Sequence, residues 1–462
     1  MSKTYNSTYI FGITLVATLG GLLFGYDTAV ISGAEKSIQA YLIDSLGMGA
    51  FAHGATVSSA LIGCIIGGAI SGFLSNRLGR KRSLQLAGFL FFTSALGSAY
   101  PEFLFFEKGA PTTGLLVMFN FYRIWGGIGV GLASAVCPTY IGEIAPAEIR
   151  GRLVSFNQFA IIFGMLVVYF VNWGIANGQT IEWINDLGWR YMFASEAIPA
   201  GLFFILLFFV PETPRYLALI QREDSALSVL EKINVSKEHA KKILNEITST
   251  VAETTKAKIF SYGKKVIVIG ILLSVFQQFV GINVVLYYAP RIFESMGVAR
   301  DASMLQTIVM GLVNVIFTVV AIITVDKWGR KPLLITGSIG MAVGMIAIAI
   351  LSYLGIISML TLIFIIIFTA SFMMSWGPIC WVYISELFPN KIRGQAVAIA
   401  VAAQWAANFL ISSTYPGMME FSSTFTYGFY GAMAILSALF VWKMVPETKG
   451  KSLEEIEKIW KK

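Results

Sequence analysis

The sequence predicts an all-α membrane protein in which twelve transmembrane helices form two pseudo-symmetric six-helix halves, joined by a cytoplasmic helical linker. Hydrophobic residues make up 56% of the 462 residues, charged residues make up 13%, and the mean hydropathy is +0.72. A soluble core could not bury that much apolar surface. Apolar runs of membrane-spanning length recur about twelve times, and short polar motifs of the first half return in the second half.

The predicted spans are apolar runs of about 20 helical residues, the length that crosses a hydrocarbon core. The first run begins near Tyr9, is too long for a signal-peptide core and lacks a small-residue cleavage site, so we expect it to be retained. In chain order the spans are expected at residues 9–33, 52–75, 83–100, 114–139, 154–176, 190–210, 265–292, 303–325, 332–354, 358–384, 396–417 and 424–445.

Basic residues gather in four short loops between these spans, so the net charge of +8 indicates membrane topology rather than nucleic-acid binding. By the positive-inside rule, these loops and both termini face the cytoplasm. The loops are 76–82 (NRLGRKR), 143–152 (EIAPAEIRGR), 326–331 (DKWGRK) and 386–393 (ELFPNKIR).

One long polar segment, residues 212–258, separates the sixth and seventh spans and carries apolar residues at helical spacing. This pattern is typical of a helical linker on the cytoplasmic side. We therefore expect an N-terminal half at 1–211, a linker at 212–262, a C-terminal half at 263–446 and a tail at 447–462.

Three motifs occur once in each half, in the same order, which indicates duplication of a six-span unit. Two parallel halves related by an axis along the membrane normal are the arrangement of major facilitator transporters, whose substrate binds between the halves near the midplane. The matched segments are 76–81 with 326–331, 143–151 with 386–394, and 211–213 with 446–448.

Acidic and basic residues of these motifs lie where they can pair across the cytoplasmic mouth when it is shut. The alternative is that they only determine topology, which explains the arginines but not the acids. We favour a cytoplasmic gate formed by Arg77, Arg80, Glu143, Arg150, Asp326, Arg330, Glu386 and Arg393.

Three charged residues lie well inside spans of the N-terminal half, and all three lie in its outer part. From the predicted outer ends of their helices, Asp27 is about 9 Å deep, Glu196 about 10 Å and Arg123 about 15 Å. An intramembrane charge is costly, so each is a candidate functional residue, and Arg123 needs a carboxylate partner. Asp27 is the nearest candidate, with Glu196 close by. The alternatives are a loop aspartate or a purely structural ion pair.

Asp27 is therefore subject to two opposed influences, because burial disfavours its charge while a neighbouring arginine favours it. A modest change in exposure or separation can then switch its proton on or off. This behaviour suits a proton-coupling site.

Amide and indole side chains converge in four spans that are otherwise apolar. Carboxamides both donate and accept hydrogen bonds, which suits a neutral polyhydroxylated ligand, and indole faces suit its C–H surfaces. The alternative is that the amides only hold helices together. The residues are Asn157, Gln158, Gln277, Gln278, Asn283, Tyr287, Tyr288, Trp376, Trp381, Gln404, Trp405 and Asn408.

Other chemistries have little support in the sequence. The three cysteines lie in apolar runs and are expected to be packing residues, and neither His53 nor His239 has a second ligand at metal spacing. We see no nucleophile with a base and no phosphate loop, so we expect a protein that is not an enzyme and carries no cofactor or metal.

These residues resemble the sugar porter family of the major facilitator superfamily, and within it the bacterial proton-coupled D-xylose carriers. The segments that carry the resemblance are TLGGLLFGYDTAVISG, RLGRKR, PETPR, QQFVGIN, GPICW and PETKG, and the likeness covers essentially the whole chain.

The resemblance implies roles for individual positions. It implies that Asp27 is the proton site, Arg123 its partner and Glu196 a modulator. Met165 occupies a position where the xylose carriers have a second glutamine, which weakens the pentose assignment. Asn76 occupies a position where many family members have aspartate. The implied sugar hydrogen-bonding residues are Gln158, Gln277, Gln278, Asn283, Trp381 and Gln404, and the implied pocket walls are Phe24, Tyr287 and Trp405.

We therefore expect a proton-coupled monosaccharide importer that works by alternating access in the bacterial inner membrane, most of all for D-xylose. D-glucose, D-galactose or L-arabinose remain alternatives, as does a sugar-sensing receptor of the same fold. The expected partners are a small neutral sugar, the proton and the lipid bilayer, with no nucleic acid, and the expected form is a monomer.

Overall fold

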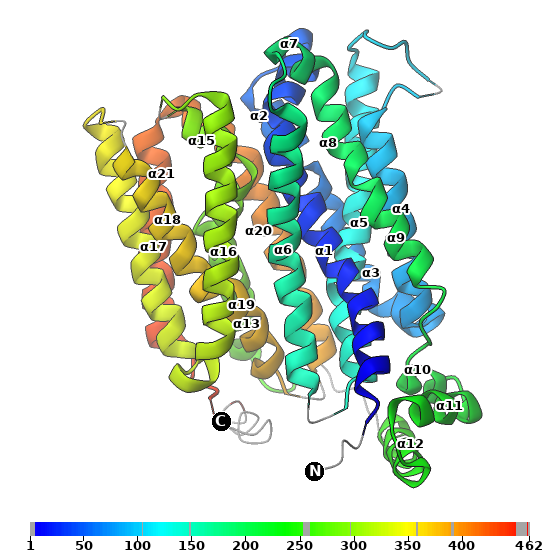
Figure 1. Cartoon of the computed structure of the whole chain (residues 1–462). Coiled ribbons are helices and arrows are strands. Elements are labelled where there is room, and N and C mark those ends of the chain that lie inside the picture. Colours follow the sequence, from blue (N-terminus) through cyan, green and yellow to red (C-terminus); the bar gives the residue numbers. More distant parts are fainter. Residues whose placement is uncertain are drawn as a thin grey trace.

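The computed structural model describes residues 5–103, 105–146, 149–252, 259–295, 297–356, 359–389, 392–449 and 460, without the side chains of residues 250–252, 301, 326, 359, 385 and 393. Long helices lie roughly side by side, and the start of α1 lies at the same end as the small helices α10 to α12 (Figure 1). We call this the linker end, and the opposite end, with α2 and α7, the far end.

The first half of the chain forms one group of helices. Within it α3 packs against α5, α1 against α6, and α4 against α5. Its elements are α1 (Ser7–Ile38), η1 (Gln39–Ile43), η2 (Asp44–Leu46), α2 (Ala50–Val57), α3 (Ser59–Leu78), α4 (Arg80–Ala99), α5 (Thr113–Ile144), α6 (Arg150–Ala176), α7 (Ile181–Trp183), η3 (Ile184–Gly188), α8 (Trp189–Ser195) and α9 (Ala197–Leu206).

The second half forms a similar group, in which α17 packs against α18 and α21, and α13 packs against α20. Its elements are α13 (Lys264–Phe279), α14 (Ile282–Tyr287), α15 (Ala289–Ser295), α16 (Arg300–Trp328), α17 (Arg330–Tyr353), α18 (Met359–Met374), α19 (Trp376–Leu387), α20 (Arg393–Phe421) and α21 (Ser423–Met444).

Three short helices connect the halves, namely α10 (Pro214–Leu219), α11 (Glu223–Ile233) and α12 (Lys237–Ala252). Ala226, Leu230 and Ile233 are buried at helical spacing on α11, as the sequence predicts. The backbone N–H of Asn6 donates to the Ile233 carbonyl at 2.8 Å, which ties the start of α1 to this linker. The domain boundaries at 211/212, 262/263 and 446/447 stay a prediction.

The all-helical membrane fold is confirmed, although fewer spans stand out than the twelve expected. Among the described residues, 10 helices are long and apolar enough to cross a membrane. The third expected span, α4, begins with the basic residues 80–82, and the sixth is interrupted at Glu196 between α8 and α9. Both run along the other helices in Figure 1.

Glycines let several helices approach to backbone contact. A Cβ atom on Gly127 of α5 would lie 1.8 Å from the Ala60 carbonyl oxygen of α3. On Gly25 of α1 it would lie 1.8 Å from the Ile161 carbonyl oxygen of α6. No side chain fits in either place, so these glycines fix how close the neighbouring helices lie.

Two of the expected spans are broken helices. The seventh consists of α13, α14 and α15, and Gly281 between α13 and α14 has a φ of 91°, which an L-residue rarely adopts. The tenth is broken at Ser375, between α18 and α19, with φ −134° and ψ −88°. Such breaks expose backbone carbonyl groups in the middle of the protein, where they can accept side-chain hydrogen bonds.

The two halves are sealed against each other at the far end. There α2 packs against α20, and a Cβ on Gly54 would lie 2.0 Å from the Ser413 carbonyl oxygen. Lys36 of α1 forms an ion pair with Glu294 of α15, and Arg291 of α15 pairs with Glu35 of α1 at 2.9 Å. The first predicted span ended at residue 33, but α1 continues to Ile38 and brings these charges to the seal.

Candidate functional site

The structure brings together Asp27 of α1 and Arg123 of α5, which are 0% and 1% exposed. Arg123 donates from Nη1 to Asp27 Oδ1 at 2.7 Å and from Nη2 to the Asp27 carbonyl oxygen at 3.3 Å. The guanidinium carbon lies 5.1 Å from the centroid of the Phe193 ring. The predicted contact is therefore present, and its role in proton coupling stays a prediction.

Glu196 is the third of the charged residues that the sequence places inside the membrane. It lies where α8 meets α9, and its side chain is 1% exposed. The charges of Asp27 and Arg123 both act on it. Among the described residues, no donor group binds either Glu196 carboxylate oxygen or Asp27 Oδ2, and the two carboxyl groups interact with each other. Two buried acids thus share one arginine. Because an uncompensated buried charge is costly, we expect one of the two acids to hold a proton.

A chain of amides runs through the broken seventh span. Gln277 donates to the carbonyl oxygens of Trp376 and Gly377 at 2.9 and 3.3 Å, at the break between α18 and α19. Gln278 donates to Gln277 Oε1 at 3.2 Å, and Asn283 donates to Gln278 Oε1 at 2.5 Å. The three predicted amides therefore form one connected group that links both broken spans.

Aromatic residues from both halves meet at α20, the helix that packs against α13 and α14. The rings of Phe24 on α1 and Trp405 on α20 have centroids 5.6 Å apart, so the two predicted wall residues contact each other across the halves. Tyr287 on α14 is 3% exposed and its hydroxyl accepts from Asn408 at 3.3 Å. Trp405 Nε1 and Gln404 Oε1 are buried without a hydrogen-bond partner among the described residues, so both can bind a ligand.

The side chains of the remaining sugar-site candidates are less buried or, among the described residues, lack hydrogen bonds to the amides above. Gln158 on α6 and Trp381 on α19 are half-buried, and no hydrogen bond joins either of them to the α13–α14 amides within the described part of the chain. Trp376 has a structural role instead, because its Nε1 donates to Leu334 O at 3.0 Å and Ser338 Oγ at 2.8 Å. Met165 is buried next to Gly25.

At the linker end, the N-terminal motifs converge on one cluster inside the first half. Arg80 donates to Glu143 at 2.9 Å, and Thr213 donates to the other Glu143 oxygen at 2.6 Å. The Glu212 carboxylate accepts from the backbone N–H groups of Arg80 and Lys81 at the start of α4. Burial raises the pKa of Glu212 above its usual value.

The second half repeats this cluster atom for atom. Arg330 donates to Glu386 at 2.9 Å, Thr448 donates to Glu386 at 2.7 Å, and Glu447 accepts from the backbone N–H groups at the start of α17. Burial opposes the charge of Glu447, but its backbone donors outweigh burial and lower its pKa. The duplication read from the sequence is thus also present in the contacts.

The gate ion pairs formed by the described residues do not cross between the halves. The pairs Arg80–Glu143 and Arg330–Glu386 each lie inside one half, because the seal between halves is at the far end. Arg150 is exposed and has no ion pair among the described residues, while the Arg77 guanidinium lies over Phe73 at 5.8 Å. The side chains of Asp326 and Arg393 lie outside the described residues.

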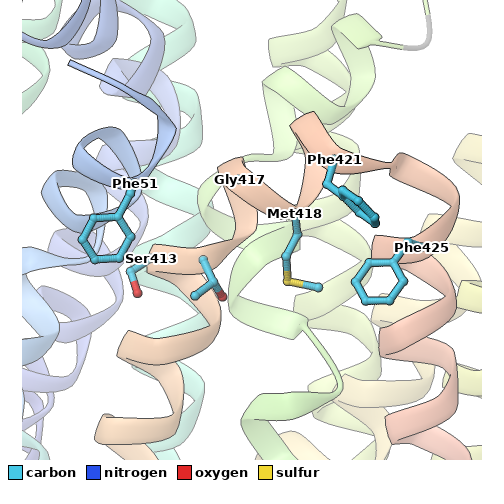
Figure 2. Close-up of a pocket in the computed structure, with 7 residues that line it drawn as sticks. Phe51, Ser413, Gly417, Met418, Phe421 and Phe425 are labelled. Atoms are coloured by element: carbon cyan, nitrogen blue, oxygen red, sulfur yellow. The ribbon is translucent and has the colours of Figure 1, made fainter.

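A pocket of about 360 Å³ lies at the far end between α2, α20 and α21. Figure 2 shows its lining, in which Phe51 faces Met418, Phe421 and Phe425 across the groove. The only side-chain polar groups of its lining are the hydroxyls of Ser413 and Thr414. A sugar needs several converging hydrogen-bond partners, so this pocket is not the sugar site.

The chain matches the family described as "Sugar (and other) transporter" over residues 13–460. It is 52% identical to the D-xylose-proton symporter of Escherichia coli K12, across 100% of this chain and 97% of that protein. It is 38% identical to the glucose facilitated diffusion protein of Zymomonas mobilis, across 100% of this chain and 99% of that protein.

Among solved structures, the fold is similar to an inward-open conformation of the xylose transporter of Escherichia coli. The TM-score is 0.89 at 52% identity, and the match covers 98% of this chain and 100% of that one.

Proposed function

The chain belongs to the sugar transporter family of the major facilitator superfamily, and we propose that it is a proton-coupled monosaccharide importer whose main substrate is D-xylose. It works by alternating access, in which the two halves part first at one end and then at the other. The 52% identity to a D-xylose-proton symporter over the whole chain supports this assignment.

The observation that carries proton coupling is the buried group of Asp27, Glu196 and Arg123. Two acids and one arginine, each at most 1% exposed, balance their charges only when one acid is protonated. Opening to either side would let water reach the group and change which acid keeps the proton. The single proton that this group needs is the one that we expect to travel with the sugar.

We place the sugar site where α13 and α14 pack against α20, which carries Gln404 and Trp405, next to Phe24 of the first half. The Gln277 amide already donates hydrogen bonds to the carbonyl oxygens of Trp376 and Gly377, at the break between α18 and α19. A sugar hydroxyl that accepts from this amide would therefore compete with those two carbonyl groups. Sugar binding would therefore loosen the contact between two broken helices. This exchange is how we expect substrate to promote the change of state.

We assign the linker end to the cytoplasm because the short basic loops are there. The far end then faces outward, and the structure corresponds to an inward-facing state closed to the outside. We propose that both termini are cytoplasmic, that the membrane is a bacterial inner membrane, and that the protein works as a monomer.

Uptake of labelled sugars in proteoliposomes tests this function. D-xylose, D-glucose, D-galactose and L-arabinose would each be offered with and without an imposed inward proton gradient. Accumulation of D-xylose above equilibrium only with the gradient supports the proposal. Equilibration that ignores the gradient identifies a facilitator, and binding without any uptake identifies a sugar-sensing receptor.

Replacement of Gln277 by alanine should weaken sugar binding about two- to tenfold, since it removes about 0.5 to 1.5 kcal/mol of hydrogen bonding. Binding would be measured by calorimetry on purified protein. Trp381→Ala should also weaken binding, and Gln395→Ala, at an exposed glutamine of α20, is the matched control. If the Gln277 and Trp381 variants both bind every sugar as tightly as the parent does, the site is misplaced.

Replacement of Glu386 by glutamine should slow transport more than it weakens sugar binding. The change removes the ion pair with Arg330, which is partly exposed and worth about 1 kcal/mol, or about a fivefold shift between states. Initial uptake rates would be compared with sugar affinity, and Glu420→Gln, exposed on α20, is the control. A loss of affinity at an unchanged rate would contradict this role.

A further inference from the structure

The far-end seal contains a buried histidine that the sugar and proton sites do not use. His53 of α2 and Glu35 of α1 are both 1% exposed, and His53 Nε2 lies 3.1 Å from Glu35 Oε2. This distance is within hydrogen-bonding range, and His53 acts on the charge of the Glu35 carboxylate. A buried imidazole nitrogen beside a carboxylate is a position that a proton can occupy.

The Glu35 carboxylate is also bound by Arg291, which belongs to the other half. Arg291 Nε donates to Oε1 at 2.9 Å, and Arg291 Nη2 lies 2.9 Å from Oε2, so the guanidinium spans both oxygens. Arg291 also donates to Gln39. His53 and Glu35 belong to the same half, whereas Arg291 leaves with α15 when the halves part. His53 and Arg291 thus compete for one carboxylate.

The charges of the sealed state leave no need for a cation at His53. Glu35 and Glu294 pair with Arg291 and Lys36, and Arg300, which donates to Ser37, adds a further cation to the seal. A proton on His53 would add one more cation to a buried cluster, which is unfavourable. Among the described residues, Glu35 of α1 and the ring of Tyr288 contact His53. The charged and titratable groups linked to these contacts are Lys36 of α1, Arg291 and Glu294 of α15, Arg300 of α16 through Ser37, and Tyr415 of α20.

We propose that His53 and Glu35 form a second proton-binding site, and that a proton taken up there from the far-end side favours the state in which the halves are parted at that end. The inference rests on the proposed alternating-access function but is independent of Asp27. A proton from water binds His53 Nε2, and the imidazolium then pairs with the Glu35 carboxylate that Arg291 has left. Acid outside would thus hold the outer mouth open.

The test measures the parting of the far end directly. Spin labels would be attached to Ser45→Cys and Ala299→Cys, at exposed positions on opposite halves, while the native Cys64, Cys137 and Cys380 are buried. All proteins would carry Asp27→Asn, so that the first proton site does not titrate. Distance distributions in lipid nanodiscs would be compared at about pH 5.5 and about pH 7.5, on either side of the usual histidine titration.

In this background, the ratio of parted to sealed protein should rise several-fold at the lower pH, with a ceiling of about tenfold per pH unit for one proton. His53→Gln should remove the response, because glutamine keeps a polar side chain without titrating. His53→Lys should part the far end at both pH values. Lys36→Gln, which removes only the neighbouring ion pair, should raise the parted fraction at both pH values and keep the response.

Either of two results would overturn the proposal. The first is a His53→Gln protein that responds to pH as its parent does, and the second is a His53→Lys protein that stays sealed. Neither result depends on sugar uptake. A failure of the proposed function would appear separately, as an unaltered chain that does not accumulate sugar in proteoliposomes.

Discussion

Replacement of Asp27 by asparagine is expected to abolish accumulation of sugar against a gradient while sugar binding stays largely intact. Asparagine keeps the volume of the side chain and can still accept a hydrogen bond from Arg123, which lies 2.7 Å from Asp27 Oδ1. It cannot exchange a proton. Without that exchange, the proton gradient has no route into the transport cycle.

The size of the loss makes the experiment decisive. With one proton per neutral sugar, each 100 mV of membrane potential supplies about 2.3 kcal/mol, enough for a concentration ratio of about 50-fold. Accumulation ratios in proteoliposomes would be measured together with sugar affinity and with equilibrium exchange. The variant should still exchange sugar across the membrane, since exchange needs no net movement of protons.

A well-folded Asp27→Asn protein that still concentrates sugar in step with an imposed pH gradient would contradict the assignment. In that case Glu196 would become the leading candidate, because it is buried and its carboxyl group interacts with that of Asp27. Glu196→Gln, made in the same way, distinguishes the two acids.

The sequence was sufficient to predict the contact between Asp27 and Arg123 because a charge within an apolar span needs a partner. It also predicted that Glu143 and Glu386 pair with basic residues of the repeated motifs, but as pairs across the cytoplasmic mouth, whereas each of the two ion pairs lies inside a single half. What the sequence could not predict is whether each acidic residue pairs with a basic residue of its own half or of the other half. Pairing within a half or between halves depends on the state of the protein, and a motif carries no information about the state.

The far-end seal shows a second reason why the sequence alone could not predict every contact. Glu35 lies just past an apolar run, so hydropathy placed it outside the membrane span, whereas α1 continues through it to Ile38. His53 has no ligand at metal spacing, and only the fold brings it to 3.1 Å from Glu35. A signal was present in the sequence, because a lone histidine in an apolar stretch needs a polar partner. Its partner could not be identified without the packing of α1 against α2 and α15.

Replacement of Arg123 by leucine is expected to be among the most destabilising single changes in the membrane core. It would leave Asp27 and Glu196, both at most 1% exposed, without a cation. Removing one partner of a buried ion pair typically costs about 3 to 5 kcal/mol. The loss would be measured as a lower thermal unfolding temperature and a lower yield of folded protein in detergent.

The double variant Asp27→Asn/Arg123→Leu separates a structural role of the pair from a role in coupling. Both charges are then gone and Glu196 can remain neutral, so most of the lost stability should return. Arg190→Leu is the matched control, because Arg190 forms a buried ion pair with Glu102 at 2.8 Å in the same half. The Arg190→Leu change should lower stability, yet the protein that folds should still accumulate sugar.

The double variant, in contrast, should fold well and fail to accumulate sugar. If the double variant accumulates sugar, the Asp27–Arg123 pair only supports the fold.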